Sequence, residues 1–189
     1  MIRDLILKNR SYRRFFEEFV ISESELAELV DLARLSGSAA NLQPLKYILS
    51  SKSEKNELIF PHTAWAGYIP DWQGPKKGER PSAYIIILGD TRISKTFGCD
   101  HGIAAQSILL GAVEKGWGGC MIGSIQRQNL RKALDIPAHF QILLIIALGK
   151  PREKVVLEKA SSGDNIKYWR DTKDVHHVPK RPLKNIILA

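Results

Sequence analysis

The stretch Gly102-Ile103-Ala104-Ala105-Gln106-Ser107-Ile108-Leu109-Leu110-Gly111-Ala112-Val113-Glu114-Lys115 has few polar positions and predicts a helix that is apolar nearly all round. Such a helix must be covered on every side, because water solvates apolar side chains poorly. One small domain satisfies this demand with difficulty. We therefore expect the same helix of a second subunit to press against it.

Around this helix, three segments are predicted as buried strands: residues 46–50, 83–88 and 142–148, of which the last two are unbroken apolar runs rich in isoleucine. Helices are predicted for residues 1–9 and 126–134. Another helix begins at Ser22, which forms a capping-box pattern with Glu25, and we expect it to stop at Gly37. The strands belong in the interior of a sheet.

The segment 116–123, which follows the apolar helix, contains four glycines but is not a dinucleotide-binding fingerprint. Met121 stands where that motif needs its third glycine, and the segment follows a helix rather than a strand. We interpret it as a turn into a short strand, where missing side chains let backbone N–H groups approach a flat ring.

Composition fits one soluble globular domain of 189 residues, with 44% hydrophobic and 25% charged residues. Cys99 and Cys120 lie far apart and match no metal spacing, so we expect no disulfide framework and a reducing, cytoplasmic location. No apolar run approaches the roughly 20 residues that span a bilayer, and the N-terminus lacks the pattern of a secretory signal. We expect no membrane partner.

The formal charge of +8 raises the alternative of a nucleic-acid-binding protein. The charges are nevertheless spread along the chain, without an RNA-binding aromatic signature, zinc-finger spacing or a clear helix-turn-helix, so we expect no nucleic-acid partner. His176 and His177 are adjacent but have no cysteine or carboxylate partners in the pattern of a metal site. We expect both to lie on the surface, with no metal.

A candidate binding motif is Arg10-Ser11-Tyr12-Arg13-Arg14-Phe15, together with Lys180-Arg181 near the other end and Asn41-Leu42-Gln43-Pro44 between them. Arginine pairs two phosphate oxygens at once, a serine hydroxyl adds a neutral donor, and an amide reads the edge of a heterocyclic ring. The set suits a phosphorylated flavin. The alternative is a group of solvated surface charges.

Two further segments attract attention. Residues 60–82 carry Trp65, Tyr68 and Trp72 and four of the nine prolines, which suggests either the lining of a substrate pocket or a hydrophobic flap over the core. The C-terminal arm, about 161–189, has little core-like content before its last seven residues. Such an arm needs a surface to lie on.

Four blocks of the chain, in order, resemble the FMN-dependent nitroreductase family. Residues 10–15 resemble its Arg-Ser-x-Arg motif, and residues 36–44 resemble its Pro-Ser-x-x-Asn-x-Gln-Pro loop. Residues 100–106 with 116–123 are similar to its central helix and glycine turn, and residues 148–151 to its Leu-Gly-x-Pro. Together these blocks extend over most of the chain.

The resemblance implies an α+β, three-layer sandwich with a central mixed or antiparallel sheet flanked by helices. It also implies an intertwined homodimer, in which residues 1–189 form one domain and the arm embraces the partner. One FMN would lie at each subunit boundary. Carried over by position, the cofactor-binding residues are Arg10, Ser11, Arg13, Asn41, Gln43, Ile122, Gly123, Ser124, Lys180 and Arg181. Gln43 has the alternative role of bracing its loop.

The implied activity is a ping-pong reduction of nitroaromatic, quinone or related small-molecule acceptors by NADH or NADPH, with hydride transfer through N5 of FMN. No protein side chain is required as a catalytic group. Trp65, Tyr68 and Trp72 are the candidate substrate-pocket residues. The alternatives are a specialised flavoenzyme of the same fold, for reductive dehalogenation or flavin breakdown, and a non-catalytic flavin-binding protein.

Overall fold

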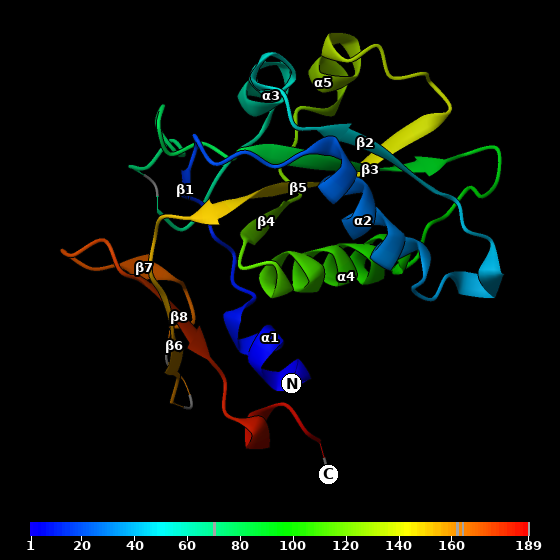
Figure 1. Ribbon diagram of the computed structural model, residues 1–189. Helices are drawn as coiled ribbons and strands as arrows, with labels where there is room; N and C mark the ends of the chain where they lie inside the picture. The colour runs from blue at the N-terminus through cyan, green and yellow to red at the C-terminus, as the bar shows by residue number, and fades with distance from the viewer. Residues whose placement is uncertain (70, 162, 164, 189) are drawn as a thin grey trace.

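The computed structural model describes residues 1–69, 71–161, 163 and 165–188. Its centre is a five-stranded sheet in which every pairing between strands is antiparallel (Figure 1). The strands are β1 (Phe15–Phe16), β2 (Leu45–Ser50), β3 (Ala83–Asp90), β4 (Gly118–Ile122) and β5 (Phe140–Pro151). The order is β1-β5-β3-β2, and β4 also pairs with β5. All three predicted strands and the short strand after the glycine turn are confirmed.

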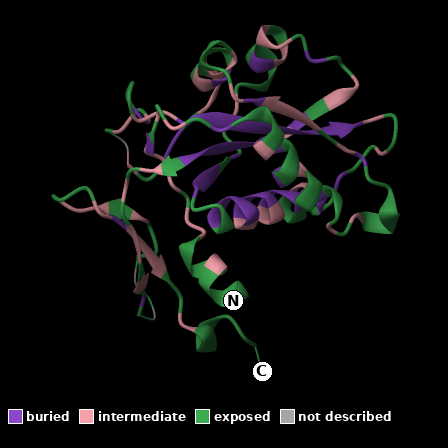
Figure 2. Ribbon diagram, viewed as in Figure 1, coloured by how far each residue is buried: buried purple, intermediate pink, exposed green. Residues whose placement is uncertain are grey.

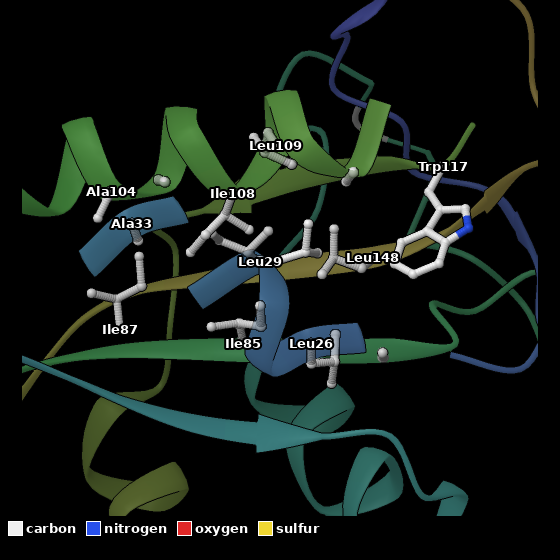
Figure 3. Packing of buried hydrophobic residues seen from close by; sticks show 14 of the residues in the cluster. Leu26, Leu29, Ala33, Ile85, Ile87, Ala104, Ile108, Leu109, Trp117 and Leu148 are labelled. Atoms are coloured by element: carbon white, nitrogen blue, oxygen red, sulfur yellow. The ribbon is translucent and has the colours of Figure 1, made fainter. Parts of the chain in front are cut away.

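Two helices cover each face of this sheet (Figure 1). On one face lie α2 (Glu23–Arg34) and α4 (Asp100–Glu114), and on the other lie α3 (Ser53–Ile59) and α5 (Arg127–Ala133). Leu29 and Ile108 of the first pair meet Ile85 and Leu148 of the sheet in one apolar cluster (Figure 3). All eight residues of β3 are buried because helices cover the sheet on both sides. The chain therefore has the three layers expected of an α+β sandwich.

The capping box predicted at the start of α2 is present. The Ser22 hydroxyl accepts a hydrogen bond from the Glu25 N–H at 3.2 Å, and the Glu25 carboxylate accepts one from the Ser22 N–H at 2.8 Å. The expected stop at Gly37 is three residues too late. The helix ends at Arg34, because Leu35 and Ser36 close its last turn through N–H bonds to the Asp31 and Ala33 carbonyls.

Helix α4 is covered by its own chain more completely than the sequence analysis predicted. Ala105, Ile108 and Ala112 have no exposed surface, because α2 and the sheet bury them together. The chain thus covers most of this helix by itself, despite the difficulty expected for one small domain, and contact with a second subunit stays a prediction. A strip around Ile103, which is 39% exposed, remains open to solvent.

The segment after β5 forms a second, smaller sheet beside the main one (Figure 1). Strand β8 (His176–Lys180) pairs in parallel with β6 (Val155–Lys159) and antiparallel with β7 (Trp169–Arg170). Few of its residues are buried (Figure 2), and Leu183, Ile186, Ile187 and Leu188 are exposed. Pro70 of the aromatic loop and Ser162, Asp164 and Ala189 of the arm lie outside the described residues.

The remaining elements are short: α1 (Ile2–Lys8) and the 3-10 turns η1 (Ala39–Asn41), η2 (Phe60–His62) and η3 (Leu183–Asn185). Helices were predicted for residues 1–9 and 126–134, and α1 and α5 confirm them. Across the described residues, no helix, α4 included, combines the length and apolarity needed to cross a bilayer.

Candidate functional site

A cavity of about 270 Å³ lies where the N-terminal motif meets the small C-terminal sheet. Its walls come from both ends of the chain: Asn9, Arg10, Ser11 and Arg13 on one side, and Tyr168, His176, Val178 and Lys180 on the other. Four of the predicted site residues, Arg10, Ser11, Arg13 and Lys180, are thus brought together. Arg181 is exposed and does not line this cavity.

Backbone contacts fix the N-terminal wall of the cavity. Ser11 forms a parallel bridge with Gly119 of β4, and the Tyr12 N–H donates to the Gly119 carbonyl at 3.0 Å. Immediately after β5, the Glu153 carboxylate accepts hydrogen bonds from the N–H groups of Arg13 and Arg14. The motif is therefore attached to two neighbouring strands of the main sheet.

The cations around this cavity fall into two groups. Arg14 pairs with Asp174 at 3.1 Å, and Arg170 pairs with Glu153 at 2.9 Å; both guanidinium groups also lie over the Trp72 ring. By contrast, no ion pair to Arg10, Arg13 or Lys180 occurs among the residues that the structure describes. The charges that remain uncompensated are those that line the cavity.

Unused donors in the cavity wall indicate what it can bind. Arg10 donates through Nη2 to the Ile6 carbonyl at 2.6 Å, but its buried Nε has no partner within the described part of the chain. Burial lowers the pKa of Arg10, although the guanidinium remains charged at any physiological pH. A buried donor without a partner is unfavourable, so the wall is suited to an anion with several acceptor oxygens.

A second cavity of about 220 Å³ adjoins the first, and Arg13 and Tyr168 border both. Its other walls come from the end of β4 and from the aromatic loop: Ala64, Trp65, Ala66, Gly67, Cys120, Met121, Ile122, Gly123 and Ser124. Three predicted ring-binding positions, Ile122, Gly123 and Ser124, therefore lie here. A Cβ at Gly123 would meet no atom within 4 Å, which leaves open space beside that backbone.

Cys120 lies in the wall of the second cavity. It is a buried free cysteine, and burial raises the pKa of its thiol. The protonated thiol is a poor nucleophile, so Cys120 serves as a small apolar wall group.

The three aromatic residues predicted for a substrate pocket have different positions. Trp65 is buried in the core cluster and lines the second cavity. Tyr68 is mostly exposed, with its ring 5.0 Å from that of Tyr168, and the Trp72 ring packs against the guanidinium groups of Arg14 and Arg170. Neither Tyr68 nor Trp72 lines either cavity.

Asn41 and Gln43 lie away from both cavities in the same chain. Their loop is held at the start of α4, where Asp100 accepts hydrogen bonds from Ser38 Oγ at 2.6 Å and from the Ala39 N–H at 3.1 Å. Gln43 donates to the Asn41 side chain at 3.2 Å, as expected for a brace. Ala40, Asn41 and Gln43 all have positive φ angles, a strained conformation that is more common at functional sites.

Tyr168 and His176 line the cavity but were not among the site residues predicted from the sequence. His176 is 1% exposed and lines the cavity, whereas His177 lies between Glu158 at 2.5 Å and Asp171 at 3.3 Å. The surface position expected for both is therefore wrong for His176. The alternation of strand β8 explains the difference, because His176, Val178 and Lys180 share one face and His177 points to the other.

The fold and the site together define the class of protein. Its structure is similar to that of a nitroreductase family protein from Streptococcus pneumoniae TIGR4, with a TM-score of 0.73 and 16% identity over the whole of both chains. It is also similar to an FMN-dependent nitroreductase from Clostridium difficile R20291, with a TM-score of 0.66 and 24% identity over 82% of this chain and 89% of the other. The fold is thus nitroreductase-like.

The sequence comparison gives the family. Residues 6–150 match the family model described as the nitroreductase family, and the chain belongs to that family. A similar relative is YodC of Bacillus subtilis (strain 168), provisionally named as an NAD(P)H nitroreductase, with 27% identity over 78% of this chain and 88% of the relative.

Proposed function

We propose that this protein uses NADH or NADPH to reduce nitroaromatic compounds, quinones or related small molecules through bound FMN. Family membership makes it an NAD(P)H-dependent flavin oxidoreductase. One observation carries the proposal for this chain: a cavity lined by cations that have no ion pair within the described residues adjoins a second cavity formed by a glycine-rich strand end and Trp65. This arrangement suits a ligand with a phosphate at one end and a flat ring at the other.

The residues of the first cavity would hold the phosphate. Arg10 offers its unused Nε–H and Ser11 a hydroxyl, while Lys180 adds a charge from the opposite wall. Backbone groups at Ile122, Gly123 and Ser124 would face the ring, and Arg13 at the border would lie between the two ends of the ligand. When bound, FMN supplies the redox chemistry by accepting a hydride at N5 and passing electrons to the acceptor.

Arg13 has an electrostatic role in this proposal. Its guanidinium has no carboxylate partner among the described residues and lies at the border of the ring cavity, where it would stabilise the negative charge of a reduced ring. Trp65 and Tyr68, beside Tyr168, would form the side from which an acceptor approaches. Trp72 would act indirectly, by packing between the arginines that hold the motif in place.

We further propose that the protein is a cytoplasmic homodimer in which each chain, residues 1–189, is one domain. The loop of Asn41 and Gln43 is held at the start of α4, and neither residue lines a cavity of its own chain, so a partner's loop would supply them. The exposed strip around Ile103 supports such an interface. The exposed apolar residues 183 and 186–188 would allow the arm of one chain to lie on the other, with Arg181 near the phosphate.

Purification and anaerobic titration test this function. The protein should bind FMN with a flavin absorbance band, and NADH or NADPH should bleach that band within seconds. An acceptor panel of a nitroaromatic, a quinone and a halogenated aromatic would then separate general reduction from a specialised reaction. Binding of FMN without bleaching by either nicotinamide would indicate a storage protein. Failure to take up FMN at all would refute the proposal.

Variants connect the test to the cavity. Arg10→Ala should weaken FMN binding about tenfold or more, because it removes a charged phosphate donor. Arg13→Ala should lower the midpoint potential of the flavin as well as its affinity. Arg34→Ala is a matched control, because Arg34 is an exposed arginine that pairs with Asp31 on the surface of α2. An unchanged potential in Arg13→Ala would remove the role given to Arg13.

A further inference from the structure

The structure assigns a role to His176. We propose that His176 is a positioning residue: a neutral hydrogen-bond acceptor that fixes the Arg13 guanidinium at the border of the two cavities without cancelling its charge. This inference rests on the proposed function in one respect, since FMN is the anion with which the positive charge of Arg13 would interact.

The geometry fixes the protonation of the His176 ring. Arg13 Nη1 lies 3.1 Å from His176 Nε2, and a guanidinium can only donate. His176 Nε2 must therefore present its lone pair, so the proton of the neutral ring is on Nδ1. This tautomer leaves the Nδ1–H as a buried donor without a partner among the described residues. A neutral ring held in this way accepts from Arg13 and carries no charge of its own.

The surroundings keep the ring in place and uncharged. The His176 N–H donates to the Lys154 carbonyl at 2.8 Å, and the Tyr168 ring lies 5.1 Å from the imidazole and 4.7 Å from the Arg13 guanidinium. Burial, together with the nearby cations Arg13 and Arg170, lowers the pKa of His176 to about 4. The carboxylates of Glu158 and Asp171 bond to His177, which belongs to the other face of β8.

A neutral acceptor has a consequence that a carboxylate would not have. Arg14 and Arg170 each pair with carboxylates, so their positive charges are compensated within the protein. Arg13 instead has an imidazole partner, and the Glu153 carboxylate bonds to the Arg13 backbone and to the Arg170 side chain. The orientation of Arg13 is therefore fixed while its full charge remains available to an anion in the cavity.

Two nearly isosteric variants separate positioning from simple packing. His176→Gln keeps a neutral oxygen acceptor near the place of Nε2, whereas His176→Glu puts a carboxylate there and neutralises Arg13. We expect His176→Gln to bind FMN within about threefold of the wild type, and His176→Glu to bind at least about tenfold more weakly, with a lower flavin midpoint potential. Lys173→Gln, at an exposed position on the same sheet's turn, lowers the net charge equally and should change neither quantity.

A second measurement uses the folded wild-type protein without FMN, so its result does not depend on whether a variant folds. Long-range ¹H–¹⁵N spectra of the wild-type protein, with its five histidines labelled and the His176 signals assigned by their loss in His176→Gln, report the tautomer directly. We expect a protonated Nδ1 and an unprotonated Nε2 from pH 5.5 to 8. An Nε2–H tautomer or an imidazolium at pH 7 overturns the proposal, as does equal FMN affinity and potential in the Gln and Glu variants.

The two proposals fail separately. If the wild-type protein does not take up FMN but its His176 shows the Nδ1–H tautomer, the proposed function is refuted and the positioning of Arg13 by His176 stands. If FMN binds and the nicotinamides reduce it while His176 shows the other tautomer, the function stands and the role of His176 is refuted.

Discussion

The buried ion pair between Glu153 and Arg170 should be among the most sensitive polar contacts of the chain. The Glu153 carboxylate is 2% exposed and the Arg170 side chain 8%, and the same carboxylate accepts from the backbone of Arg13 and Arg14. Glu153→Gln leaves the Arg170 guanidinium buried without a counter-charge, although the amide oxygen can still accept from the backbone. Removing one partner of a buried pair costs about 3–5 kcal/mol.

Thermal unfolding followed by circular dichroism measures this loss. For a chain of this size, a loss of about 4 kcal/mol corresponds to a fall of roughly 8–16 °C in the unfolding midpoint. The matched control is Glu28→Gln, which breaks the exposed Lys115–Glu28 pair of 2.6 Å. An exposed pair is worth about 0–1 kcal/mol, so this variant should lose no more than roughly 4 °C.

A double variant checks the mechanism. Glu153→Gln combined with Arg170→Met removes both charges, and it should recover more than half of the lost stability because no uncompensated charge remains buried. If Glu153→Gln is no less stable than Glu28→Gln, the buried pair does not hold the N-terminal motif as described. If the double variant is less stable than the single one, desolvated charge is not the cause of the loss.

Three further outcomes are expected. Gly119→Ala should lose about 1–3 kcal/mol in urea unfolding, because its Cβ would lie 2.6 Å from the Ala147 carbonyl oxygen, whereas Gly102→Ala meets nothing within 4 Å and should be neutral or slightly stabilising. Ser22→Ala should lose about 1 kcal/mol with the capping box, and an unchanged urea midpoint would show that the cap is redundant. The unfolded chain protonates His176 near its ordinary pKa of 6.5 and the folded chain only near 4, so stability should fall as pH drops through that window. The fall should be shallower in His176→Gln, and parallel curves would contradict the neutral ring.

Local patterns were sufficient for the elements of the main sandwich. Runs of isoleucine predicted β3 and β5, and Ser22 with Glu25 predicted the start of α2, because both signals lie within a few residues. Phosphate binding by the Arg10 motif was also predicted from residue type, since guanidinium groups and a serine hydroxyl suit a phosphate whatever the fold, and it stays a prediction. These predictions depend on residue type and spacing alone.

The rest of the site depends on contacts between residues far apart in the chain. The Glu153 carboxylate accepts a hydrogen bond from the Arg13 N–H across 140 positions, and no local sequence pattern near either residue predicts this contact. Tyr168 follows a polar stretch without periodicity. Its place in the cavity wall depends on the fold, which brings its ring beside Arg13. The two arginines Arg13 and Arg14 look equivalent in the sequence, yet one pairs with carboxylates and the other with an imidazole. That difference is decided by tertiary structure.

The main sheet forms the core of the protein, whereas the small C-terminal sheet forms one wall of the cavity, and this separation has a consequence for proteolysis. A chain cut after Ala160 would keep all five strands of the main sheet and the helices on both of its faces, so the fragment should survive as a compact particle. It would lack Tyr168, His176 and Lys180, and therefore one side of the cation-lined cavity. Proteolytic loss of that segment would thus abolish anion binding while the main sheet and its helices stayed folded.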